Sequence, residues 1–216
     1  MIVRTSKNRG LLCLTGLFVS AMLGTALASE PTVELRWALG AQEADGSAPS
    51  GIQKDTQLDT GARLKFLVEP LSAGSVYLIL LDSSDEIHLL FRQPASAAAP
   101  GDPAYVPPGS QWFELDQESG QETFFLLASV EPLPDLEALL TRYDESDPAA
   151  KREVGGEIVQ EIRRLHKANR EFARPVEKPV MIGGQTRSAG SGTSIDRLAV
   201  EISAERFYGK TITIDH

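Results

Sequence analysis

The residues best placed to do chemistry surround His88. Asp82, Ser83 and Ser84 precede it by a few positions, and serine, histidine and aspartate are the parts of a hydrolytic triad. A triad also needs oxyanion donors around a positioned nucleophile, and the chain contains no G-x-S-x-G elbow. A serine in a hairpin turn offers no such donors. We therefore interpret His88 as an ordinary strand residue and predict no catalytic residue.

The other titratable clusters do not match metal-binding or phosphate-binding patterns. The histidines His88, His166 and His216 lack H-x-x-H spacing. The acidic run 144–147 lacks the glycine and later glutamate of a calcium loop, and no phosphate-loop pattern occurs. We predict no metal site and no cofactor. Hydrolysis through paired carboxylates stays open, because aspartates and glutamates are abundant.

His166 lies in a basic run, residues 163–167, on a predicted helix. We interpret this run as a solvated polar face near the helix C-terminus, where positive charge suits the helix dipole. The alternative is a small docking patch for an acidic partner.

Four aromatic residues accompany a proline-rich segment, residues 93–110: Phe91, Tyr105, Trp112 and Phe113. Long segments without regular structure often carry function, and aromatic side chains beside prolines can form a peptide-binding surface. We predict a possible interaction surface at these four residues. The alternative is a core tryptophan on an edge strand beneath a rigid covering loop.

The elements that position these residues follow from hydrophobic periodicity. Period-two alternation or short apolar runs predict strands, at residues 32–39, 61–70, 75–82, 86–91, 111–116, 122–130, 196–203 and 206–215. Polar turns at 82–85 and 117–121 predict two hairpins. Apolar residues at helical spacing predict a short helix over 134–143 and a longer one that Asp147 caps and Pro175 ends. Residues 183–192 are predicted to form a flexible loop.

These elements predict a single, mainly β domain. We expect an antiparallel β-sandwich with one short and one longer helix inserted before the C-terminal strands. Residues 29–216 form this domain, and residues 144–216 supply its helix, glycine-rich loop and last two strands.

Residues 1–28 are predicted to be a secretory signal peptide. Arg4, Lys7 and Arg9 precede an uncharged run that closes on Ala26-Leu27-Ala28, which is the A-x-A cleavage pattern. An uncleaved membrane anchor is the alternative. We expect a periplasmic or extracellular protein without an integral membrane segment after cleavage.

The mature chain is acidic and free of cysteine. Losing three basic residues with the signal changes the net charge from −9 to −12, and the single cysteine, Cys13, leaves as well. Nucleic acids require a basic footprint, so we exclude them as partners. Without a cysteine, the domain has no disulfide and no thiol nucleophile.

Four stretches carry a resemblance to a known family: Gly61 with the following RLKFLVEP, residues 74–82, residues 87–91, and residues 106–109 with 120–128. Together they resemble Domain of Unknown Function 4384 over residues 58–143. Arg92-Gln93 replaces the Pro-Asn that usually follows the strand ending in Phe91, and Asp85 replaces a turn glycine. The resemblance implies an exported or envelope-associated β domain, often attached to peptidase, kinase or signalling modules, and it implies no catalytic residues.

Export, β architecture and the lack of an assembled catalytic set together favour a non-catalytic interaction domain of the bacterial cell envelope. Its expected partner is an envelope protein, bound through an edge strand or the proline-segment surface. The alternatives are an envelope hydrolase that uses paired carboxylates and a β domain that binds a small ligand.

Overall fold

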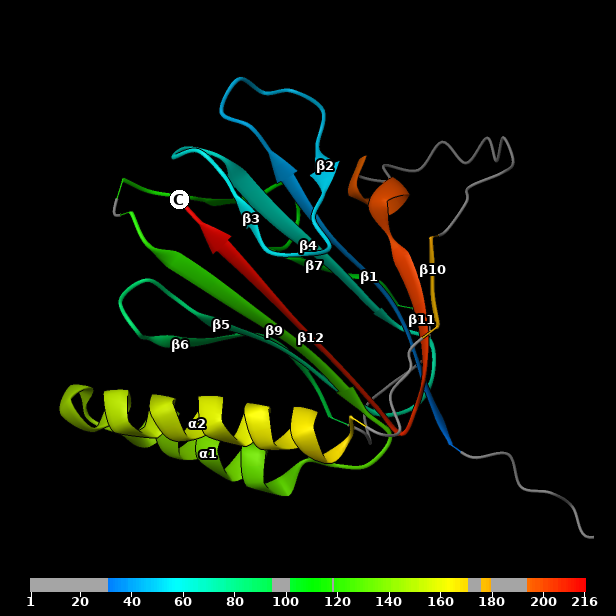
Figure 1. The fold of residues 1–216 in the computed structure, drawn as a ribbon, viewed down its shortest axis with the longest axis vertical. Helices are drawn as coiled ribbons and strands as arrows, with labels where there is room; N and C mark the ends of the chain where they lie inside the picture. The colour runs from blue at the N-terminus through cyan, green and yellow to red at the C-terminus, as the bar shows by residue number, and fades with distance from the viewer. Residues whose placement is uncertain (1–30, 95–101, 118, 171–175, 180–193) are drawn as a thin grey trace, which may run out of the picture.

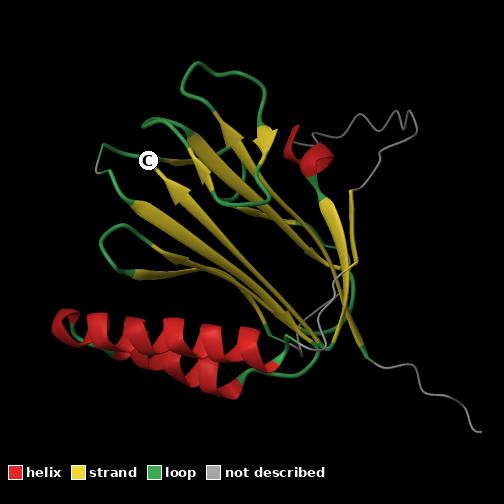
Figure 2. Ribbon diagram, in the orientation of Figure 1, coloured by secondary structure: helices red, strands yellow, loops and turns green. Residues whose placement is uncertain are grey.

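Two β-sheets pack face to face, and a pair of helices covers the outer face of one of them (Figures 1 and 2). The computed structural model describes residues 31–94, 102–117, 119–170, 176–179 and 194–216. The first sheet has the order β10 (Val176–Pro179), β11 (Val200–Glu205), β1 (Thr32–Gln42), β4 (Arg63–Pro70) and β7 (Ala104–Val106). In the same sheet, β2 (Ser50–Gly51) pairs with β1, and β8 (Phe113–Glu114) pairs with β4.

The second sheet carries the helices. Its order is β3 (Thr56–Gln57), β12 (Phe207–Asp215), β9 (Gln121–Ser129), β5 (Ser75–Leu81) and β6 (Ile87–Gln93). The described strand pairs are antiparallel except β3 with β12. The helices α1 (Pro134–Glu145) and α2 (Pro148–Ala168) lie on its outer face (Figure 1). The predicted sandwich with one short and one longer helix is confirmed.

The layer between the sheets is the main hydrophobic core. The alternation that predicted β4 is confirmed, because Leu64, Phe66 and Val68 all lie in this layer. The ring of Phe66 meets that of Phe124 from the opposite sheet, with 4.8 Å between centroids. Trp37 of β1 is also buried there. Apolar side chains at every second position therefore join the two sheets.

The helices form a second core with the outer face of the second sheet. The run 75–82 is apolar at consecutive positions because β5 is covered on both faces: Leu78 faces the other sheet, and Ile79 faces the helices. Asp147 caps α2 as predicted, since its carboxylate accepts hydrogen bonds from the backbone N–H groups of Ala149 and Ala150. The helix ends at Ala168, before the predicted end at Pro175, which lies outside the described residues.

The predicted second hairpin is wrong. Residues 111–116 and 122–130 do not pair with each other: β8 pairs with β4 in the first sheet, whereas β9 pairs with β5 and β12 in the second. The backbone N–H of Leu115 donates to the carbonyl of Ala62, and this bond holds the segment against β4. Alternation reveals that a strand forms but not which strand it pairs with.

Two further expectations need correction. The proline-rich segment was predicted to contain no regular element, yet Ala104–Val106 forms β7 and pairs with β4; residues 95–101 lie outside the description. The strand predicted at 196–203 begins only at Val200, because Ser194–Leu198 forms a 3₁₀ helix that covers the outer face of the first sheet with Ile195 and Leu198. The predicted strand at 206–215 is confirmed as β12. The loop predicted at 183–192 lies outside the described residues.

Candidate functional site

A pocket of about 230 Å³ opens between the sheets, at the end of the sandwich near the turn from β5 to β6. We call it the edge pocket. Its apolar lining comes from both sheets, with Leu64 and Phe113 from the first and Leu80 and Phe124 from the second. Its polar lining includes Asp82, Glu114, Glu122 and His216. An apolar lining with a few converging polar groups is typical of a ligand site.

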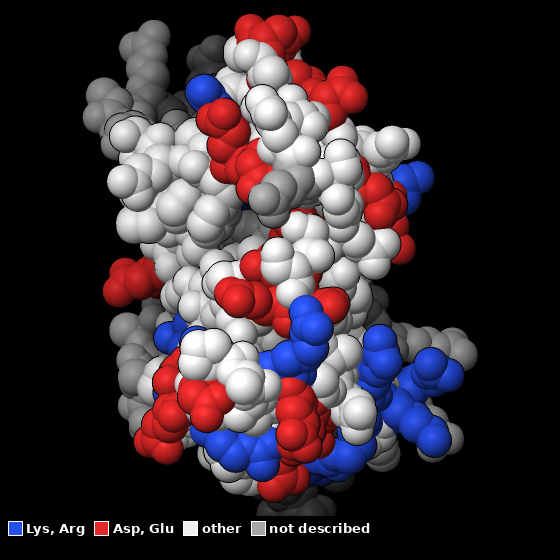
Figure 3. Space-filling view, turned by 90° about the vertical axis from the view of Figure 1, so that its left-hand side faces the viewer, with Lys and Arg blue, Asp and Glu red and all other residues white. Residues whose placement is uncertain are grey.

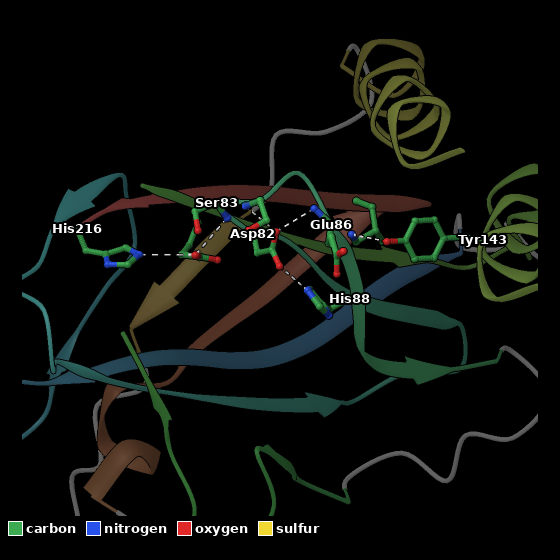
Figure 4. A network of polar contacts seen from close by, with 9 residues as sticks. Asp82, Ser83, Glu86, His88, Tyr143 and His216 are labelled. Carbon is green, nitrogen blue, oxygen red and sulfur yellow. Dashed lines mark hydrogen bonds and ion pairs between the residues drawn. The ribbon is translucent and has the colours of Figure 1, made fainter. Parts of the chain in front are cut away.

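The turn from β5 to β6 positions the first of these polar groups. Asp82 accepts hydrogen bonds at Oδ1 from the backbone N–H groups of Ser84 and Glu86, at 2.9 and 2.8 Å. Asp85 adopts a positive φ of 65°, which turns the chain back toward β6. The other oxygen of Asp82, Oδ2, then lies 2.6 Å from Nε2 of His88 (Figure 4).

The surroundings of Asp82 keep its carboxylate charged. Partial burial acts to raise its pKa, but the hydrogen bonds from His88 and from the backbone of Glu86 and Ser84 outweigh burial, so the pKa of Asp82 lies below its ordinary value. A general acid needs the opposite shift. The structure therefore suits Asp82 to holding a cation and not to donating a proton.

His88 and Asp82 make the base–carboxylate contact of a triad without a nucleophile. Among the described residues, no serine hydroxyl hydrogen-bonds to His88. Ser83 and Ser84 instead meet Asp82 or Glu122 through their backbone N–H groups. The interpretation of His88 as a strand residue agrees with its position in β6.

The same turn brings together three potential metal ligands. Ligand atoms of Asp82, Glu86 and His88 all lie within 4.8 Å of one another, with Glu86 and His88 exposed. One imidazole and two carboxylates form a donor set that zinc and manganese accept. These are the residues that could hold a divalent cation, although the sequence pattern predicted no metal site.

His216 is the polar group that the sequence reasoning missed. Its side chain is 1% exposed, and Nε2 lies 3.6 Å from Oε1 of Glu122, too far for a hydrogen bond. Neither ring nitrogen has a hydrogen-bond partner. The backbone of His216 exchanges two hydrogen bonds with Gly120, which hold the ring in the pocket wall. The inward alternation of Ile212 and Ile214, continued by one step, was the available signal.

Glu122 links His216 to the turn. Its Oε1 also accepts a 3.3 Å hydrogen bond from the backbone N–H of Ser83 (Figure 4). On the face at this end of the molecule, Asp and Glu predominate in the upper and central parts, whereas the lower part carries both Lys or Arg and Asp or Glu side chains (Figure 3). The edge pocket therefore lies in an acidic environment.

The four predicted surface residues do not form one patch. Tyr105 and Trp112 flank the ammonium of Lys65, with their ring centroids 5.9 and 5.7 Å from Nζ. Phe113 lines the edge pocket. Phe91 lies on β6 in the other sheet, partly buried against the main core. The assignment of these residues to an interaction surface stays a prediction.

Lys65 explains how the segment after β7 is held. The alternation in the sequence predicted that Lys65 lies on the polar side of β4, yet its side chain is fully buried. Its ammonium donates to the backbone carbonyls of Gly109 and Gln111, at 2.5 and 2.8 Å, and burial lowers its pKa. The cation thus fastens this segment over the outer face of the first sheet.

The prediction that His166 lies on a solvated helix face is wrong. Its ring packs edge-on against Phe207 of β12, with 6.1 Å between ring centroids. Its Nε2 is buried without a hydrogen-bond partner, and burial lowers its pKa. The neighbouring Arg163 and Lys167 are exposed. The helix turns about 100° per residue, so one residue of a basic run can face the sheet while its neighbours face solvent.

Neither helix in the described part of the chain is long and apolar enough to cross a membrane. No protein-family model, curated protein or solved structure matches this chain.

Proposed function

We propose that the protein is an exported, non-catalytic interaction domain of the bacterial envelope, which binds a partner protein by pairing with an extended segment along the outer edge of β6. The observation that carries this proposal is the position of β6 at the end of the second sheet. None of the described residues forms a strand on its outer side. An unpaired edge offers backbone donors and acceptors to an added strand.

The side chains of β6 support the same proposal. Leu89, Leu90 and Phe91 are three consecutive apolar residues, and all are partly exposed. The register shift opposite Leu78 and Ile79 leaves Leu90 without a partner in β5. Such a bulge redirects side chains at a sheet edge. A bound segment would cover this apolar surface as well as the backbone.

The length of open edge follows from the hydrogen bonds at its start. The backbone N–H of Ile87 donates to the hydroxyl of Tyr143, so α1 already occupies the edge there. Because N–H groups alternate in direction along a strand, the N–H of Leu89 also points outward. The open edge therefore begins beyond Ile87 and includes the backbone of Leu89.

A proline substitution at Leu89 tests this proposal. Proline removes only an outward N–H at this position, so the internal ladder with β5 is kept. The protein would be purified from an exporting host after mild crosslinking, and a stoichiometric partner identified by mass spectrometry. We expect Leu89→Pro to lose the partner. Leu89→Ala keeps the backbone N–H, so it should retain more of the partner than Leu89→Pro does. A folded Leu89→Pro variant that retains the partner in wild-type yield would contradict strand addition.

The edge pocket favours a second function, the binding of a small ligand or side chain. It combines apolar walls with polar groups from four strands or their ends. The hydrolase alternative receives less support, since the pKa of Asp82 is lowered and a glycosidase acid needs a raised one. Turnover of purified cell-wall polymer by the wild-type protein, lost in Asp82→Asn, would favour the hydrolase instead.

A further inference from the structure

The buried imidazole of His216 has no hydrogen-bond partner at either ring nitrogen. Its side chain is 1% exposed, neither nitrogen is bonded, and it lines the edge pocket. Buried polar groups in native proteins nearly always have hydrogen-bond partners, because a buried group without one lowers the free energy of unfolding. A group bound in the pocket would supply the missing bond.

The groups around His216 define the charge of that ligand. Asp82 and Glu122, two residues with carboxyl side chains, line the same pocket. The chain carries a net charge of −9, and acidic side chains predominate on this part of the surface (Figure 3). These groups favour a cation, and a neutral imidazole nitrogen can also accept a hydrogen bond from one.

The shape of the pocket selects among cations. Leu80, Phe113 and Phe124 form an apolar wall, which suits a methylene chain leading to a charged end. The acceptors come from separate elements: Asp82 follows β5, Glu122 lies in β9, and His216 follows β12. An ammonium has three donors that reach acceptors in different directions, whereas a planar guanidinium fits a single bidentate partner best.

We propose that the edge pocket binds the ammonium end of a lysine side chain from a partner polypeptide. The ammonium donates to Glu122, Asp82 and Nε2 of His216, and the alkyl stem lies against the apolar wall. The proposal rests on the proposed function, since the lysine belongs to the bound partner. The turn that forms one wall of the pocket also leads into β6, so one partner can meet both features.

A titration without any partner protein tests the pocket. Nα-acetyl-lysine methylamide would be added to the ¹⁵N-labelled protein, and binding followed by the NMR shifts of the backbone amides. Parallel titrations would use the corresponding norleucine and arginine compounds and 1,5-diaminopentane. We expect saturable shifts of the Ser83, Gly120 and Glu122 amides with the lysine compound and weaker shifts with the other three. Glu122→Gln should weaken lysine binding about tenfold, the effect of losing one charge-assisted hydrogen bond.

Glu131→Gln is the matched control, because it removes the same charge from a 70% exposed side chain remote from the pocket lining. It should leave the affinity within about twofold of wild type, since surface charges contribute little at a distance. His216→Phe should also weaken lysine binding while keeping a ring of similar size. Equal binding of lysine and norleucine compounds, or equal effects of Glu122→Gln and Glu131→Gln, would overturn the proposal.

Two further results separate the possible failures. Saturable binding of the diamine without binding of the lysine compound would overturn the lysine assignment in favour of a free amine. Lysine binding that survives in Leu89→Pro, together with normal partner capture by that variant, would reject strand addition at β6 and retain the pocket. Failure of the pocket and failure of the edge-strand proposal are therefore distinguishable.

Discussion

A single methyl group added at Gly209 of β12 should disturb the packing of α2 on the second sheet. A Cβ atom built on Gly209 would lie 2.4 Å from Nε2 and 2.7 Å from Cδ2 of His166, and 2.9 Å from Cε1 of Phe207. These distances are below van der Waals contact, so Gly209→Ala must displace the imidazole from its place between α2 and β12. Overpacking of this kind costs about 1–3 kcal/mol in the free energy of unfolding.

The prediction can be worked through as a double-mutant cycle. In a His166→Ala background the two shortest contacts, those with the imidazole, are gone and the 2.9 Å contact with Cε1 of Phe207 remains, so Gly209→Ala should cost less than about 1 kcal/mol. The two substitutions should therefore show a coupling energy of about 1–2 kcal/mol. Urea unfolding followed by tryptophan fluorescence measures it, since Trp37 is 1% exposed in the main core.

A matched control comes from α2 itself. A Cβ atom built on Gly156 would have nothing within 4 Å, so Gly156→Ala should stabilise the protein by up to about 1 kcal/mol. Additive effects of Gly209→Ala and His166→Ala, with coupling below about 0.5 kcal/mol, would refute the packing of His166 between α2 and β12.

Three further predictions concern buried polar groups. Burial lowers the pKa of His166 below 6.5, so the unfolded chain takes up the proton first as pH falls. The contribution of His166 to the free energy of unfolding should be fully present above pH 6.5 and decline as pH falls from there toward the lowered pKa, and urea unfolding should show that His166→Gln removes this part of the pH dependence. Lys65→Met should cost about 1–3 kcal/mol and speed amide exchange in residues 107–112, because two carbonyls lose the ammonium donor; unchanged exchange would contradict the fastening role. Tyr143→Phe should cost about 1–3 kcal/mol by thermal unfolding, because the buried N–H of Ile87 loses its acceptor.

Much of the element pattern could be predicted because its signals are local. The alternation of Leu64, Phe66 and Val68 predicts β4, and Asp147 followed by Pro148 predicts the start of α2. Each signal needs only a few neighbouring residues to act. The wrong second hairpin shows the limit, since the pairing of β8 and β9 depends on sheets assembled from distant parts of the chain.

In the candidate site, too, contacts within one turn could be predicted from the sequence, whereas contacts between distant segments could not. Asp82 and His88 flank one short turn, so their proximity could be inferred from the sequence. Lys65 and the Gly109 carbonyl are separated by 44 positions, and no local pattern predicts their contact. Glu122 and His216 meet only because β9 and β12 pair along their whole lengths.

By itself, the sequence determined the type of most elements, the mainly β class and the acidic charge, because these depend on composition and short-range periodicity. Tertiary structure alone decided which strands form each sheet, that Lys65 is buried and His166 half-buried against expectation, and that Asp82, Glu122 and His216 share one pocket. The physical reason is that pairing and burial are set by contacts between segments far apart in the chain, whose free energies no local pattern contains.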